Sequence, residues 1–98
     1  MKLAYFHAAW CGVCHDKAPL VERLAAELRL PLERWDVDDE AGRAESERRR
    51  IRTVPTLALI HGERVPFRLI GRMIEPENVH RLVAQFRGTT SGAESAEP

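Results

Sequence analysis

The feature that most constrains this chain is a Cys-x-x-Cys pair, Cys11 and Cys14, placed directly after an apolar run and directly before a helical pattern. At a helix N-terminus, unpaired backbone N–H groups and the helix dipole stabilise an anion, which favours the thiolate form of Cys11. Cys14 follows one helical turn later, close enough to form a disulfide with Cys11 and deeper in the helix. The spacing therefore favours a redox dithiol in which Cys11 is the nucleophile and Cys14 is the resolving thiol.

Two other functions use the same pattern. Two nearby cysteines occur as half of a zinc site, and the stretch from Cys11 to His15 matches the Cys-x-x-Cys-His sequence that attaches c-type haem. The remaining histidines offer no Cys or His pair at the spacing of a zinc finger. Haem attachment would need an export signal and an axial methionine or histidine ligand. Metal binding and haem binding stay open as alternatives at this point.

The composition limits the classes of partner. The 98 residues suffice for one domain. Fifteen basic residues balance fifteen acidic ones, so no net charge draws the chain to nucleic acid or to an anionic membrane. No apolar run approaches the roughly 20 residues that span a bilayer, and a signal peptide within residues 1–10 would be cleaved inside the cysteine motif. We therefore expect a cytoplasmic protein without nucleic-acid or membrane partners, in a compartment where disulfides are usually transient and catalytic.

Apolar patterns predict the first three elements. Residues 3–8 form a short apolar run, typical of a strand that is covered on both faces. From Gly12 to about residue 30, apolar residues recur at helical spacing. Residues 32–37 predict a second strand. A strand, helix, strand order implies that the two strands pair in parallel.

The middle of the chain predicts a second helix. The acidic residues 38–40 suit a helix N-terminus, and the residues that follow are weakly amphipathic. Arg48, Arg49 and Arg50 lie in this helix with glutamates interleaved, and no aromatic residue accompanies them. We therefore expect a solvated helix face rather than a nucleic-acid interface.

The last part of the chain predicts a hairpin and a helix. Residues 57–60 are continuously apolar and typical of a buried central strand. Residues 65–69 alternate in polarity around Pro66, which predicts an edge strand on the other arm of the hairpin. Pro76 suits the first position of a final helix, which Gly88 should end.

The domain organisation follows from these elements. Residues 89–98 are small, polar or acidic and show no periodicity, so they have nothing to bury. We expect one domain over residues 1–88 and a disordered C-terminal tail over residues 89–98.

This order of elements resembles the thioredoxin-like fold. Three segments carry the resemblance further. Residues 9–14, with the sequence Ala-Trp-Cys-Gly-Val-Cys, resemble the thioredoxin active-site segment; Val54-Pro55-Thr56 resembles its cis-proline segment; and Gly71 falls where thioredoxins keep a glycine beyond the last strand. The resemblance covers residues 2–87. It implies a minimal, glutaredoxin-sized α/β fold with a four-stranded mixed sheet flanked by helices.

The resemblance also implies a thiol:disulfide oxidoreductase that reduces protein disulfides. Cys11 would attack a substrate disulfide, and Cys14 would then release the substrate by closing the redox-active Cys11–Cys14 disulfide. We expect disulfide-containing proteins as substrates, a thioredoxin reductase or a low-molecular-weight thiol as reductant, no bound cofactor or metal, and a monomer. The implied substrate-binding residues are Trp10, Gly12, Val13, Val54, Pro55 and Gly71. A core position for Trp10 and a plain strand-entry role for Pro55 are the alternative interpretations.

The sequence departs from the thioredoxin pattern where that family holds a buried aspartate that relays a proton to the resolving cysteine. Tyr5 occupies the matching position, and a phenol is a poor base at neutral pH. Arg34 replaces the partner lysine and cannot exchange protons either. Deprotonation of Cys14 then falls to water, to His7, which we expect to be packed, or to His15, which we expect in solvent. This departure supports an alternative function, a thioredoxin-fold metal-binding or redox-sensing module without turnover.

Overall fold

The computed structural model describes residues 1–96, with side chains described as far as residue 88. Its elements follow the order strand, helix, strand, helix, strand, strand, helix, with a short 3₁₀ turn before the last helix. In chain order they are β1 (Lys2–His7), α1 (Gly12–Leu28), β2 (Leu32–Asp36), α2 (Glu40–Arg49), β3 (Thr56–His61), β4 (Arg64–Ile70), the turn η1 (Gly71–Met73) and α3 (Pro76–Ala96).

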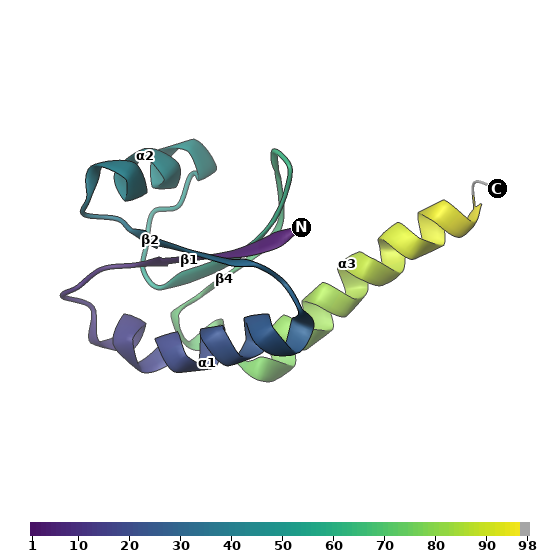
Figure 1. Ribbon diagram of the computed structural model, residues 1–98, viewed down its shortest axis with the longest axis horizontal. Coiled ribbons are helices and arrows are strands. Elements are labelled where there is room, and N and C mark those ends of the chain that lie inside the picture. Colours follow the sequence, from purple (N-terminus) through teal and green to yellow (C-terminus); the bar gives the residue numbers. More distant parts are fainter. Residues whose placement is uncertain (97–98) are drawn as a thin grey trace.

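The four strands form one mixed sheet in the order β2-β1-β3-β4. β1 is parallel to β2 and antiparallel to β3, and β3 is antiparallel to β4. α1 and α3 cover one face of the sheet, and α2 covers the other (Figure 1). The predicted four-stranded α/β fold is confirmed, including the parallel first pair, the central position of β3 and the edge position of β4.

The core has two parts because strand side chains point alternately to the two faces of a sheet. On one face, Leu3 and Tyr5 of β1 pack in a cluster with Leu24 of α1 and Val79 of α3. The other face, beneath α2, holds a smaller cluster: Ala4, Phe6, Ile51, Ala58 and Ile60. β1 is therefore covered on both faces, as predicted, and its carboxyl end is fixed where the chain turns into α1.

The prediction of a solvated arginine face on α2 is wrong at Arg49, which is only 6% exposed. Its Nε lies 3.0 Å from Oε2 of Glu45, and its Nη1 donates to the backbone oxygen of Gly62 at 3.3 Å. Burial alone would raise the pKa of Glu45, but hydrogen bonds from Arg49 and Arg48 hold that pKa below its ordinary value. A paired charge tolerates burial, and a local charge pattern does not reveal which arginine meets a partner across the fold.

α3 runs to Ala96, so the predicted end of this helix at Gly88 is also wrong. A single glycine costs about 1 kcal/mol relative to alanine in a helix but keeps its backbone N–H, and no proline follows before Pro98. The domain boundary at residue 88 and the disorder of residues 89–98 stay predictions, because the side chains of 89–96 and the whole of 97–98 lie outside the described residues. Neither α3 nor another helix in the described part of the chain is long and apolar enough to cross a membrane.

Candidate functional site

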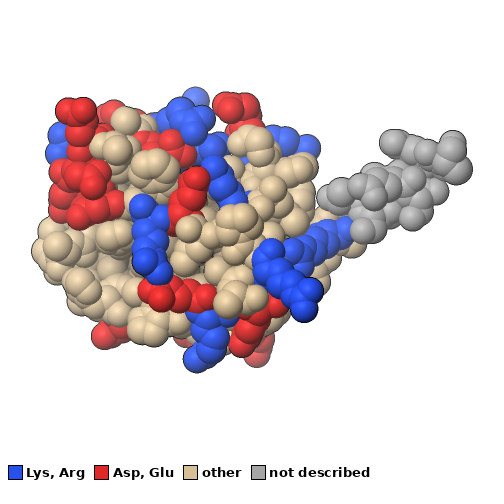
Figure 2. All heavy atoms as spheres, in the orientation of Figure 1, with Lys and Arg blue, Asp and Glu red and all other residues tan. Residues whose placement is uncertain are grey.

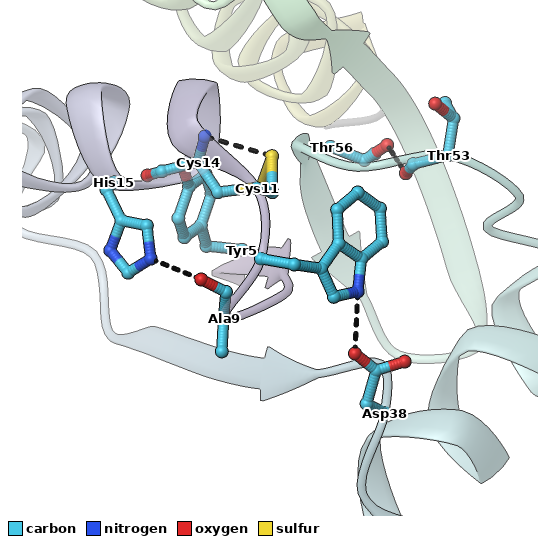
Figure 3. Close-up of a disulfide and its surroundings, with 9 residues drawn as sticks. Tyr5, Ala9, Cys11, Cys14, His15, Asp38, Thr53 and Thr56 are labelled. Carbon is cyan, nitrogen blue, oxygen red and sulfur yellow. Dashed lines mark hydrogen bonds between the residues drawn. A yellow bond between two sulfur atoms is a disulfide. The ribbon is translucent and has the colours of Figure 1, made fainter.

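The two cysteines lie at the start of α1. Cys11 is the N-cap residue of this helix, and its Sγ accepts the backbone N–H of Cys14 at 3.1 Å (Figure 3). The two side chains form a disulfide, with their Cα atoms 5.2 Å apart. Cys11 is 7% exposed and Cys14 is 2% exposed. Because an N–H group aimed at Sγ stabilises negative charge there, the geometry suits a thiolate at Cys11 and a more buried partner at Cys14.

Trp10 lies on the surface beside the disulfide. Its side chain is 71% exposed, and its Nε1–H donates to Oδ2 of Asp38, in the loop between β2 and α2, at 2.8 Å (Figure 3). A core position for Trp10 is therefore wrong. Trp10 forms one wall of a pocket of about 260 Å³ whose other lining residues are Val37, Ser46, Ile51, Arg52, Thr53 and Val54.

The segment before β3 packs against the cysteine pair. Val54 packs against the cluster formed by Ala8, Cys11 and Cys14. The Val54–Pro55 peptide bond is cis, and the oxygen of Pro55 accepts the backbone N–H of Gly71 at 3.0 Å. Gly71 has a φ of 54°, in the left-handed region that favours glycine. Gly12 and Val13 stand between the cysteines in the first turn of α1, so all the predicted site residues converge on one end of the sheet.

Tyr5 lies beneath the first turn of α1 and binds its backbone. The hydroxyl group donates to the backbone oxygen of Cys14 at 2.6 Å (Figure 3), and the side chain is buried. Burial raises the pKa of Tyr5 to about 12. The hydroxyl proton is therefore held by a carbonyl, and the phenol positions the helix instead of accepting a proton from the Cys14 thiol.

The ionisation of Tyr5 gives a direct test of this burial, because it is the only tyrosine in the chain. We expect a pKa of about 12 in the folded protein and about 10 in the unfolded chain. Because the folded-state pKa is the higher one, Tyr5 contributes full stability below pH 10, and that contribution is lost as the pH rises from about 10 through 12. An absorbance titration of tyrosinate, with and without guanidinium, measures both values. A folded-state midpoint near 10 would contradict the buried hydrogen bond.

A second pocket, next to the cysteine pair, has a volume of about 240 Å³. Cys14 lines it together with His7 from the end of β1 and His15 from α1. His15 is exposed, as predicted, and its Nε2 lies 2.8 Å from the backbone oxygen of Ala9 (Figure 3). His7 is half-buried, and its ring stacks on Tyr5 with 5.8 Å between centroids. The other lining residues are Tyr5, Ala8, Ala18, Glu22 and Arg34.

The sequence did not point to Asp38 or Arg52 as site residues. The sequence pattern indicates only an acidic helix start for Asp38, and Arg52 follows the arginine run 48–50 that predicts a solvated face. The one available signal for Asp38 was its place after β2, since parallel neighbours β1 and β2 end at the same edge of the sheet. Among the described residues, no group of three or more His, Cys, Asp or Glu side chains is placed to hold a metal ion.

The sequence of this chain is similar to those of known proteins. The family model described as thioredoxin matches residues 1–85. Thioredoxin 2 of Chlorobaculum tepidum is 32% identical over 79 residues, which cover 79% of this chain and 69% of that protein. A thioredoxin-like protein of Synechocystis is 33% identical over 57 residues, which cover 58% of this chain and 54% of the relative. The matched region thus spans little more than half of the Synechocystis protein.

Solved structures share the fold over most of the chain. Thioredoxin 1 from Thermosipho africanus superposes with a TM-score of 0.78 and 22% identity, covering 93% of this chain and 99% of that one. A mutant thioredoxin from Halobacterium salinarum gives a TM-score of 0.73 and 30% identity, with 85% of this chain and 71% of that chain covered. The sheet and the helix that carries the cysteines are therefore arranged as in these proteins.

Proposed function

Because this chain belongs to the thioredoxin family, we propose that it is a thiol:disulfide oxidoreductase that reduces protein disulfides by cycling Cys11 and Cys14. The observation that carries the proposal is the place of Cys11 at the N-cap of α1, where its Sγ accepts a backbone N–H. A thiolate is the attacking species in disulfide exchange, and this position favours it.

The reaction requires two exchanges. First, the Cys11 thiolate attacks one sulfur of the substrate disulfide; the new bond joins Cys11 to the substrate, and the other substrate sulfur leaves with the electron pair of the broken bond. Second, Cys14 loses its proton and attacks Sγ of Cys11, which breaks the mixed disulfide and releases the second substrate thiolate. The substrate gains two electrons and the protein is left with the Cys11–Cys14 disulfide. The dithiol carries both electrons, so the reaction needs no bound cofactor.

The surface around Cys11 suits a protein substrate. On the face shown in Figure 2, the end of the molecule formed by the loop between β1 and α1 carries no charged side chains, and acidic side chains gather next to it over the start of α2. Trp10, Val13 and Met73 are exposed apolar residues on the segments that surround the disulfide. We assign substrate binding to the predicted residues Trp10, Gly12, Val13, Val54, Pro55 and Gly71.

The rest of the cycle is proposed from the same chemistry. Reduction of the Cys11–Cys14 disulfide requires a donor of two electrons, for which we propose a thioredoxin reductase or a low-molecular-weight thiol. We place the reaction in the cytoplasm, where thiols are kept reduced and disulfides are usually transient and catalytic. A monomer is sufficient, since one chain supplies both cysteines.

A redox titration tests the proposal. Purified protein is equilibrated in thiol/disulfide buffers, and alkylation of Cys11 and Cys14 is followed by intact mass. We expect one reversible two-electron transition, with a midpoint nearer to the −270 mV of reducing thioredoxins than to the −180 mV of isomerases. Stoichiometric zinc or copper, a haem absorbance band, or the absence of any intramolecular disulfide would instead support a metal-binding, haem-binding or sensing module.

A further inference from the structure

The second exchange needs a group that takes the proton from Cys14, and two neighbours of Cys14 are unable to do so. The hydroxyl of Tyr5 already donates to the backbone oxygen of Cys14, and burial raises the pKa of Tyr5 to about 12. The Arg34 guanidinium, paired with Glu22 at 2.7 Å, stays protonated at any pH at which the protein works. The proton must therefore leave through another group.

The pocket behind Cys14 holds the candidates. It is open to solvent, and Cys14 lines it together with two imidazoles, one from β1 and one from α1. Side chains of β1 alternate, so His7 shares the α1-facing side of the strand with Leu3 and Tyr5. Its ring stacks on Tyr5, whose hydroxyl donates to the backbone oxygen of Cys14, and His7 and Cys14 line the same pocket.

The two histidines differ in how they are held. His15 lies on the exposed side of α1, with its Nε2 directed at the backbone oxygen of Ala9 (Figure 3). Because a carbonyl oxygen only accepts, Nε2 of His15 carries the proton in this contact, and that nitrogen is unavailable as a base. His7 is half-buried at the end of a strand whose position is fixed by the core on both faces.

We propose that His7 accepts the proton of the Cys14 thiol during the second exchange, through solvent in this pocket. The proton passes from Sγ of Cys14 to the His7 ring, the Cys14 thiolate attacks Sγ of Cys11, and the departing substrate thiolate later takes up a proton. When a thiol reductant opens the disulfide, the imidazolium returns a proton to Cys14. This inference rests on the proposed oxidoreductase function and names the group that serves it.

Several charged groups face His7 and bear on its protonation. Glu22 and Arg34 line the same pocket and largely cancel, because they form an ion pair. Asp36 of β2 lies opposite His7 in the strand register. His15 lines the same pocket. The pH profile of the second exchange therefore reports His7 only if variants of its neighbours are compared.

Stopped-flow mixing of the reduced protein with dithiobis(nitrobenzoate) separates the two exchanges. Attack by Cys11 releases the first equivalent of coloured thiolate, and attack by Cys14 on the mixed disulfide releases the second. We expect His7→Gln to slow the second phase by roughly ten- to a hundredfold at neutral pH and to leave the first phase unchanged. The dependence of the second-phase rate on pH should change in this variant, because the group that takes up the proton is removed.

Matched variants distinguish proton transfer from a structural role. His15→Gln, in the same pocket, should leave both phases and the pH profile as in the unaltered protein. Added imidazole should restore the second phase of His7→Ala, since the pocket is open to solvent. His7→Asn serves as a second variant if His7→Gln folds poorly by circular dichroism.

Each remaining outcome overturns the inference. An unchanged second phase in His7→Gln and His7→Asn removes His7 from the step, and slowing confined to His15→Gln moves the role to His15. A slow second phase that keeps its pH profile and is not rescued by imidazole shows that His7 only supports the structure. If the unaltered protein releases a single equivalent, the proposed dithiol cycle fails instead, and this result is distinct from all the others.

Discussion

Replacing Cys11 with serine should abolish disulfide reduction, whereas replacing Cys14 with serine should trap substrates as mixed disulfides on Cys11. Cys11 holds the helix N-cap position in which its Sγ accepts a backbone N–H, and it is the more exposed of the pair. Serine at position 11 removes the nucleophile, so the rate should fall to that of the uncatalysed exchange. Serine at position 14 leaves the first exchange intact but removes the thiol that releases the substrate.

Mass spectrometry of protein incubated with a model disulfide substrate measures both effects. Cys14→Ser should gain the mass of one substrate chain, and a thiol reductant should remove it. The Cys11→Ser variant should gain none, and the double variant controls for attachment elsewhere. Equal trapping by the two single variants would show that the roles assigned to the cysteines are wrong.

Much of the fold was predictable because local patterns determine it. The apolar runs of β1 and β3 lie in the middle of the sheet and are covered on both faces, and Pro66 lies in the edge strand β4. Arg49 was not predictable, because its burial depends on Glu45 and on the Gly62 carbonyl, and the latter is brought close only by the tertiary fold. The extension of α3 past Gly88 was missed because a glycine weakens a helix without breaking its hydrogen bonds.

The functional site was likewise predictable from the sequence only in part. The cysteine pair and the Pro55 segment carry short motifs, so their place was readable from the sequence. The partner of Trp10 was not, because Asp38 is 28 residues away and meets the indole only through the parallel pairing of β1 and β2. The residue type alone shows that Tyr5 cannot act as a general base at neutral pH, but only the structure shows that its hydroxyl donates to the backbone oxygen of Cys14. Residue chemistry was therefore predictable, and the direction of each contact was not.

Replacing Gly42 with alanine should destabilise the protein and disturb the site from a distance. A Cβ atom at Gly42 would overlap the backbone carbonyl of Asp36, and it would lie 3.0 Å from Oδ1 of Asp39, which caps α2 by accepting the Gly42 N–H at 2.7 Å. The carbonyl belongs to β2 and cannot rotate away, so α2 must shift. We expect a loss of roughly 2–3 kcal/mol in the free energy of unfolding, measured by urea denaturation.

Gly88→Ala provides the matched control, because a Cβ atom at Gly88 would have no neighbour within 4 Å among the described residues outside the backbone of its own helix. Both substitutions exchange glycine for alanine inside a helix, which by itself should stabilise the protein by up to about 1 kcal/mol. If Gly42→Ala lowers the free energy of unfolding and Gly88→Ala raises it, the loss at Gly42 is due to its contact with β2.

The loop between β2 and α2 also holds Asp38, the hydrogen-bond partner of Trp10. A shift of α2 should therefore also change the indole fluorescence and slow the first exchange at Cys11. Gly42→Ala with unchanged stability would show that α2 can move away from β2 at no cost, and would remove the link from this helix to Trp10.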